Sequence, residues 1–155
     1  MNLKKHFKEV MEIKTSPHSI ATGFALGTLI AILPTFGLGI LIGLLIIWIF
    51  KRISKISMLV AFAIWNPLVL AILYPLEYSV GNFFMPTLPI TKFKIQILNQ
   101  LFIYTARFLL GSLVLSITAS ILSYILVLLL VKKYQKQKLK SLTTELKEAK
   151  KVLKI

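Results

Sequence analysis

The amino-acid sequence predicts an all-α integral membrane protein with one domain, for three reasons. Three stretches of 32, 21 and 24 residues contain no Asp, Glu, Lys, Arg or His, namely 19–50, 56–76 and 108–131. Each is longer than the about 18 apolar residues that mark a transmembrane candidate. Hydrophobic residues make up 57% of the chain and charged residues 15%, whereas a soluble domain has about 25% charged residues. The charged residues gather between these stretches and at the two ends of the chain.

The first apolar stretch predicts a helical hairpin over residues 17–50. Ser16 followed by Pro17 is a typical helix start, because a hydroxyl caps free amides and proline suits the first turn. A Pro-Thr-Phe-Gly motif beginning at Pro34 leaves two arms of about 20 Å each, at about 1.5 Å per residue. Since the hydrocarbon core is about 30 Å thick, the hairpin is either re-entrant or formed by two short spans. Small residues four apart predict close packing of the two arms on each other, at Gly23, Gly27, Gly39 and Gly43.

The other apolar stretches predict two further spans. The second stretch forms a span over residues 56–77, which is broken by Asn66-Pro67 and ends near Pro75. We expect the rest of the membrane domain to consist of an outer loop over 78–94, an interfacial helix over 95–107 and a span over 108–131.

Both ends of the chain are rich in lysine. Residues 1–15 predict an amphipathic cytoplasmic helix, and residues 132–155, with nine lysines and two glutamates, predict a basic helical tail. The tail carries an apolar stripe with alternating spacings of 3 and 4 residues, formed by Leu139, Leu142, Leu146, Ala149 and Leu153. This stripe permits pairing with a second copy or a protein partner, or contact with the membrane surface. We expect contact with the membrane surface, because the lysines of the tail are attracted to an anionic leaflet.

The distribution of basic residues predicts the orientation. The N-terminal segment, the loop 51–55 and the tail hold 16 of the 19 basic residues. Basic clusters that flank spans stay in the cytoplasm, so an even number of crossings has to separate each pair of clusters. We therefore predict a multi-pass protein of the cytoplasmic (inner) membrane with both termini in the cytoplasm. The net charge of +14 predicts contact with anionic membrane lipids and not with nucleic acid.

The sequence offers no group of residues suited to catalysis. It contains no Cys and no Asp, and its two histidines, His6 and His18, lie outside the apolar stretches. Metal-ligand spacings, phosphate-binding loops and nucleophile–base pairs are missing from it. We therefore expect no enzymatic activity, no metal site and no cofactor.

The two breaks in the apolar stretches predict a ligand-binding site. In lipid, non-helical backbone is tolerated only where it is packed in protein or lines a cavity, and transporters build midplane sites from interrupted helices. The alternative is structural, with Pro34 turning the hairpin and Asn66 satisfying the carbonyl that Pro67 leaves free. The candidate ligand-binding residues are Pro34, Thr35, Gly37, Asn66 and Pro67.

Two ionisable residues, Glu77 and Arg107, border the predicted spans on their outer side. They permit an ion pair, or a contact between Arg107 and a lipid phosphate. The alternative, which we expect, is that both side chains reach toward water from the span ends.

Several motifs follow one another along residues 10–131: a serine-proline entry, an alanine- and glycine-rich helix, a proline-x-x-glycine break and a later asparagine-proline. The positions that carry them are Ser16, Pro17, Ala21, Gly23, Gly27, Pro34, Gly37, Asn66 and Pro67. Together they resemble a family of small prokaryotic membrane proteins catalogued as domain of unknown function two-zero-six-two. The resemblance implies a multi-span membrane protein and no particular activity. Some relatives carry the domain beside glycosyltransferases, which implies cell-envelope or lipid-linked sugar chemistry.

These observations predict a small transporter or a lipid-handling protein of the cell envelope. The alternative is a non-transporting membrane scaffold or accessory subunit that binds a partner through the C-terminal helix.

Overall fold

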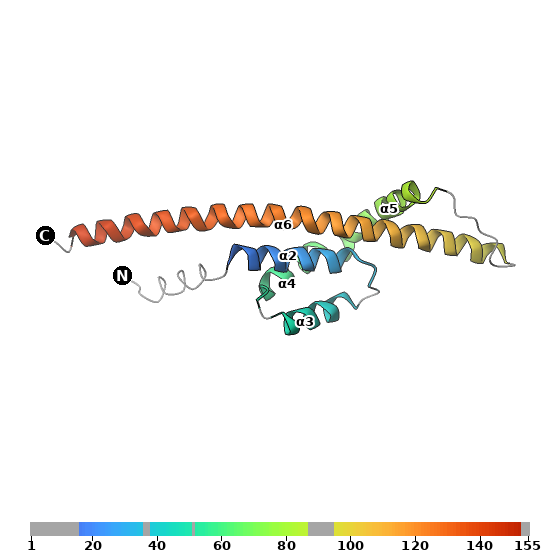
Figure 1. The fold of residues 1–155 in the computed structure, drawn as a ribbon, viewed down its shortest axis with the longest axis horizontal. Coiled ribbons are helices and arrows are strands. Elements are labelled where there is room, and N and C mark those ends of the chain that lie inside the picture. Colours follow the sequence, from blue (N-terminus) through green and yellow to red (C-terminus); the bar gives the residue numbers. More distant parts are fainter. Residues whose placement is uncertain (1–15, 36–37, 51, 87–94, 153–155) are drawn as a thin grey trace.

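The structure is a computed structural model that describes residues 16–35, 38–50, 52–86 and 95–152. Its regular elements in these ranges are α-helices, which confirms the all-α prediction. The amphipathic helix predicted over residues 1–15 lies outside the described residues. The helices are α2 (Pro17–Ile32), α3 (Gly39–Ile49), α4 (Lys55–Ile64), α5 (Pro67–Phe84) and α6 (Gln96–Val152), as Figure 1 shows.

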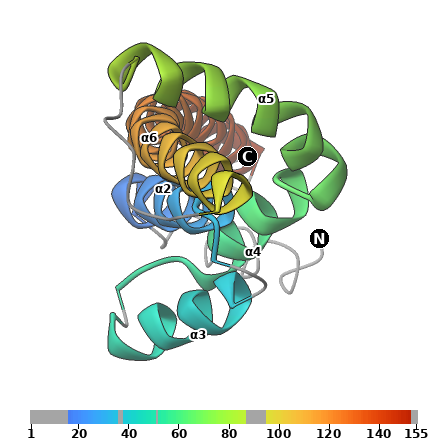
Figure 2. The same ribbon diagram turned by 90° about the vertical axis from the view of Figure 1, so that its right-hand side faces the viewer.

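Helix α6 is the axis of the molecule. It has 57 residues and is therefore about 85 Å long at about 1.5 Å per residue. Helix α2 runs antiparallel beside it, because His18 contacts Tyr124 at 2.8 Å while the hydroxyl of Ser120 donates to the carbonyl of Ala25 at 2.9 Å. Viewed along α6, helix α2 and helix α5 cover different sides of it, and α3 is the outermost helix (Figure 2).

Local sequence explains where α2 begins. The hydroxyl of Ser16 accepts a hydrogen bond from the amide of Ser19 at 3.1 Å, and Pro17 occupies the first turn. The predicted helix start is therefore confirmed, since Ser16 satisfies one of the amides that a helix leaves free at its N-terminus.

The glycines of α2 pack against α4, and not against the second arm of the predicted hairpin. A Cβ on Gly23 would lie 2.5 Å from the carbonyl oxygen of Ser54, and one on Gly27 would lie 2.7 Å from the Cβ of Ala61. The hydroxyl of Ser57 also donates to the carbonyl of Ile20 at 2.7 Å. The prediction of glycine-mediated packing between the two arms is wrong for these positions, because α4 occupies the face that the glycines open.

Helix α3 follows the same pattern. A Cβ on Gly43 would lie 2.7 Å from the ring of Phe62 on α4. Gly39 lies at the first break, where a Cβ would come within 2.9 Å of the Thr35 hydroxyl. Of the four predicted packing glycines, Gly39 is thus the one that faces the other arm of the hairpin. A Cβ on it would lie 3.6 Å from the Cγ2 atom of Ile30, near the end of α2.

Helix α5 continues past the point where the sequence places the end of the second span. It runs through Pro75 to Phe84, so residues 78–84 of the predicted outer loop are helical. Residues 85 and 86 are outside the helix, and 87–94 are outside the described residues. A proline inside a helix removes one hydrogen bond, and here packing of Gly81 against the backbone of Arg107 on α6 supports the helix beyond it.

Helix α6 joins three segments that the sequence separates. The predicted interfacial helix over 95–107, the span over 108–131 and the tail form one helix as far as Val152. The reason is local, since residues 96–152 contain no proline and a single glycine, Gly111. A change from apolar to basic composition alters the preferred solvent of a helix without breaking its hydrogen bonds. The tail therefore continues along the axis of the apolar segment (Figure 1).

Among the described residues, one helix, α6, is long and apolar enough to cross a membrane. The candidate span is its segment Gln96–Glu145, and 6% of the most apolar window of this segment is buried against the rest of the protein. Helices α4 and α5 form a second candidate if the pair, bent by 70°, counts as one span, and α2 and α3 are shorter apolar helices. By length and composition the described residues thus contain one or two spanning elements. The multi-pass arrangement predicted from the sequence remains a prediction.

Candidate functional site

The two breaks, which lie some 30 residues apart in the sequence, line one pocket. It has a volume of about 440 Å³ and lies between the end of α2, the start of α3 and the α4–α5 junction. Four of the five predicted ligand-binding residues line it, and Gly37 lies outside the described residues. These four are Pro34, Thr35, Asn66 and Pro67.

The described residues of the first break are Leu33, Pro34, Thr35 and Leu38. Because the residue before a proline is pushed out of the helical region, Leu33 is extended, with φ −60° and ψ 137°. The amide of Leu38 then donates to the carbonyl of Thr35 at 2.9 Å and starts the turn into α3. Pro34 has no N–H, so α2 supplies no donor for the carbonyl of Ile30, and Ile30 also lines the pocket.

The second break is capped by Asn66. Its side-chain oxygen accepts hydrogen bonds from the amides of Leu68 at 3.0 Å and Val69 at 3.2 Å. Its amide nitrogen lies 3.5 Å from the carbonyl of Ala63, which is the acceptor that loses its donor through Pro67. Asn66 thus has the structural role named as the alternative, because its side chain binds the backbone at the end of α4 and at the start of α5.

The remaining wall of the pocket comes from residues that the motifs do not include. Trp65 lines it, and its indole N–H donates to the hydroxyl of the fully buried Thr28 at 3.1 Å. This bond ties the α4–α5 junction to α2. Phe62 and Leu70 add apolar surface. The available sequence signal is the position of Trp65, an indole in the interior of an apolar stretch instead of at its end.

A neighbouring pocket of about 640 Å³ lies between α5 and α6. Tyr78 and Tyr104 stack at 4.3 Å between ring centroids on its wall, and Tyr74 meets Phe108 edge to face at 5.6 Å. Tyr74 and Phe108 line both pockets, so this aromatic pair is their common wall. Pro75 also lines the second pocket, where it deprives the carbonyl of Ala71 of a helical donor.

The structure does not bring Glu77 and Arg107 into an ion pair. Arg107 donates to the carbonyls of Met85 at 3.2 Å and Pro86 at 3.0 Å and to the hydroxyl of Tyr78 at 3.3 Å. It therefore satisfies carbonyls at the C-terminal end of α5, where a cation is favourable. Glu77 is fully buried, and neither of its carboxylate oxygens has a hydrogen-bond partner. The expectation that Glu77 reaches toward water is wrong, because α5 packs directly on α6 here, where a Cβ on Gly111 would overlap the carbonyl oxygen of Glu77.

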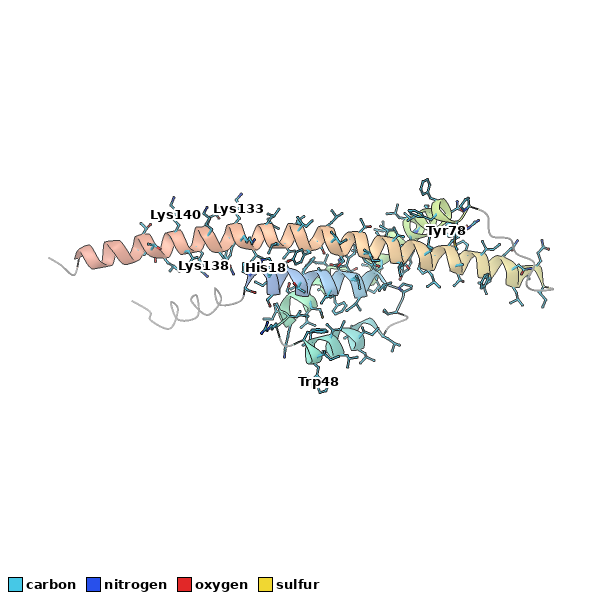
Figure 3. All side chains as sticks on the ribbon, in the orientation of Figure 1. His18, Trp48, Tyr78, Lys133, Lys138 and Lys140 are labelled. Carbon is cyan, nitrogen blue, oxygen red and sulfur yellow. The ribbon has the colours of Figure 1, made fainter. Side chains whose placement is uncertain are left out.

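Basic residues gather at one end of the described molecule. The hydroxyl of Ser19 at the start of α2 donates to the carbonyl of Arg52 at 2.5 Å, so the basic loop lies beside this start. His18 contacts Tyr124 on α6, two turns before the tail begins. Figure 3 shows Lys133 and other tail lysines toward this end and Tyr78 toward the opposite one.

A family model matches residues 2–140, which is most of the chain. Its description is uncharacterized protein conserved in bacteria (DUF2062). The chain belongs to this family. The match confirms the resemblance carried by the serine-proline entry and the two breaks. No curated protein and no solved structure matches the chain.

Proposed function

We propose that this member of the DUF2062 family is a multi-pass inner-membrane protein that binds and handles an amphiphile of the cell envelope. The observation that carries the proposal is the convergence of both helix breaks on one pocket. Two breaks that only turned or capped helices would not have to lie close together. A binding site, in contrast, requires its polar groups at one place.

The chemistry of the two pockets favours a ligand with an apolar chain and a polar head. The pocket at the breaks is lined mainly by apolar residues, with Thr35 as a polar one, and it includes Ile30, whose carbonyl receives no i+4 helical hydrogen bond because of Pro34. The neighbouring pocket offers hydroxyls, among them those of Tyr78, Ser79 and Thr105. Because Tyr74 and Phe108 separate the two, one elongated ligand can occupy both by displacing this pair.

The membrane location rests on exposed apolar surface. Trp48, Leu68, Ile72 and Phe83 are among the large apolar side chains that the fold leaves exposed. Exposed apolar surface of this extent is stable against lipid and unstable against water. The gathering of basic residues at one end supports a cytoplasmic location for that end and contact with an anionic leaflet.

The test is to fill the pocket and measure bound lipid. Leu70 lines the pocket, while Leu68, on the same turn of α5, is 80% exposed. The protein is extracted with its native lipids as wild type, Leu70→Trp and Leu68→Trp, and the co-purified lipids are compared by mass spectrometry. We expect the wild type and Leu68→Trp to enrich one lipid or lipid-linked sugar over the bulk membrane, and Leu70→Trp to lose it. Bulk lipid proportions in all three samples would exclude a selective site.

A second candidate function is that of a scaffold or accessory subunit. The observation in its favour is the unbroken continuation of α6 into the tail, which holds a charged helix away from the apolar segment. Deletion of residues 135–155 is then expected to remove a specific partner or to convert an oligomer to a monomer. An unchanged partner list and an unchanged oligomeric state after the deletion would rule this function out.

A further inference from the structure

Helices α5 and α6 meet at a contact that only glycine permits. A Cβ on Gly81 would overlap the carbonyl oxygen of Arg107, and a Cβ on Gly111 would overlap the carbonyl oxygen of Glu77. The backbones therefore touch on both sides of the crossing. Two small hydroxyl residues, Ser112 and Ser116, are fully buried on the same helix.

Glu77 lies at this contact with no group to bind it. Its side chain is fully buried, and neither carboxyl oxygen has a hydrogen-bond partner in the described part of the chain. The hydroxyl protons of Ser112 and Ser116 are already given to the carbonyls of Leu109 and Leu113, both at 3.0 Å. Both carboxyl oxygens of Glu77 are thus buried and unpaired among the described residues.

Among the described residues, no charged side chain pairs with Glu77. Helix α6 is the helix that packs against α5 (Figure 2), and its ionisable groups near the crossing are Tyr104 and Arg107; those of α5 are Tyr74 and Tyr78. The Arg107 guanidinium is directed at the end of α5 and at Tyr78. Burying an unpaired carboxylate costs far more free energy than burying the neutral acid.

We propose that Glu77 is a proton-binding site at the crossing of α5 and α6. In the closed contact the carboxyl carries a proton. Release of the proton to water leaves a carboxylate, which requires water or a cation to reach the crossing and hence α5 to move from α6. Protonation closes the contact again. The inference depends on the crossing and not on the pocket at the breaks, so it holds or fails independently of the proposed function.

A metal cation is a poor occupant of the same place. Hard cations take six or more oxygen ligands, whereas the described residues contain no group of three or more His, Cys, Asp or Glu side chains that could hold a metal ion. A proton needs one oxygen atom and no further ligand. Membrane-embedded carboxyls with this environment are typical of proton relays.

The first experiment measures the protonation state by infrared spectroscopy on the full chain in its native lipids at pH 7. We expect Glu77→Gln to remove a carbonyl band of a carboxylic acid, and Glu145→Gln, which changes an exposed glutamate of the tail, to remove carboxylate bands. Loss of carboxylate bands from Glu77→Gln would overturn the proposal.

The second experiment needs no substitution. A hydrophobic carbodiimide attaches to protonated carboxyls in apolar surroundings, and mass spectrometry locates the adduct on the wild-type protein. We expect an adduct on Glu77, none on Glu145, and a labelling rate that falls as the pH rises. A labelling rate that is constant with pH, or protection of Glu77 by sodium ions at constant pH, would overturn the proton site.

Discussion

The contact between α2 and α4 gives a sharp quantitative prediction. A Cβ added to Gly27 would lie 2.7 Å from the Cβ of Ala61 and 2.8 Å from the carbonyl oxygen of Met58. Overpacking of this kind costs about 1–3 kcal/mol, and the gain in helix propensity from Gly to Ala offsets about 1 kcal/mol. We therefore expect Gly27→Ala to lower the free energy of unfolding by up to about 2 kcal/mol, the difference between these two terms.

The second member of the pair provides the control. Ala61→Gly removes the methyl group nearest to the new one, at a cost of about 1 kcal/mol in helix propensity and about 0.8 kcal/mol in lost burial. We expect the double variant Gly27→Ala, Ala61→Gly to be more stable than the sum of the two single effects by about 1 kcal/mol. Residues in direct contact show such coupling, while distant residues add.

The assay is thermal or denaturant unfolding of the four proteins in the same lipid–detergent mixture. Gly39→Ala serves as the matched glycine control, because its nearest obstacle is the movable hydroxyl of Thr35 at 2.9 Å. A change of 1 kcal/mol corresponds to roughly 2–4 °C for a chain of this size. Additive effects of Gly27→Ala and Ala61→Gly, together with a large loss of stability for Gly39→Ala, would refute the packing of α2 on α4. They would instead support the predicted hairpin, in which α2 packs on α3.

Three further predictions follow from the site and the crossing. Asn66→Ser keeps an N-cap acceptor and is expected to be near wild type in stability, whereas Asn66→Ala is expected to lose about 1 kcal/mol, as measured by unfolding. Arg107→Gln leaves carbonyls at the end of α5 unsatisfied and is expected to increase amide hydrogen exchange in residues 78–85 more than in α2; equal exchange in both helices would contradict the capping contact. Because a carboxylate without a partner is costly to bury at the crossing of α5 and α6, the free energy of unfolding is expected to fall as the pH rises, and Glu77→Gln is expected to remove this dependence.

Local chemistry made part of the fold predictable. Ser16 and Pro17 place the start of α2, and the prolines at 34 and 67 place both breaks, because each acts through its own backbone. The same reasoning misjudged Pro75, since α5 continues through it with support from Gly81, whose packing partner is distant in sequence. The continuity of α6 was predictable from its lack of breakers, but the change in composition at Lys132 suggested a boundary.

The partners of the glycines could not be read from the sequence. Spacing shows that Gly23 and Gly27 open one face of a helix, and it contains no information on which helix occupies that face. The pocket depends on the same information, because Thr35 and Asn66 line one pocket only when α4 lies beside α2. Glu77 shows the limit for charged residues, since it is buried where α5 packs on Gly111 of α6, a contact between positions that are distant in sequence.

The two breaks are chemically unequal, and this inequality indicates where a ligand would bind. At the second break, the side chain of Asn66 accepts hydrogen bonds from the first amides of α5 and approaches the carbonyl of Ala63. The backbone groups that this break leaves unpaired thus find partners within the protein. At the first break α2 provides no donor for the carbonyl of Ile30, although this residue lines the same pocket as Thr35. A ligand hydroxyl or amide would find its acceptor at the first break. Thr35→Val, which keeps the shape of the side chain and removes the hydroxyl, is therefore expected to weaken lipid retention more than Asn66→Ser. In the variant Thr35→Cys, whose parent chain has no cysteine, the retained lipid is expected to block labelling of the new thiol. The opposite order of the two substitutions would place the ligand at the second break, where the structure has already committed the polar groups to the helix ends.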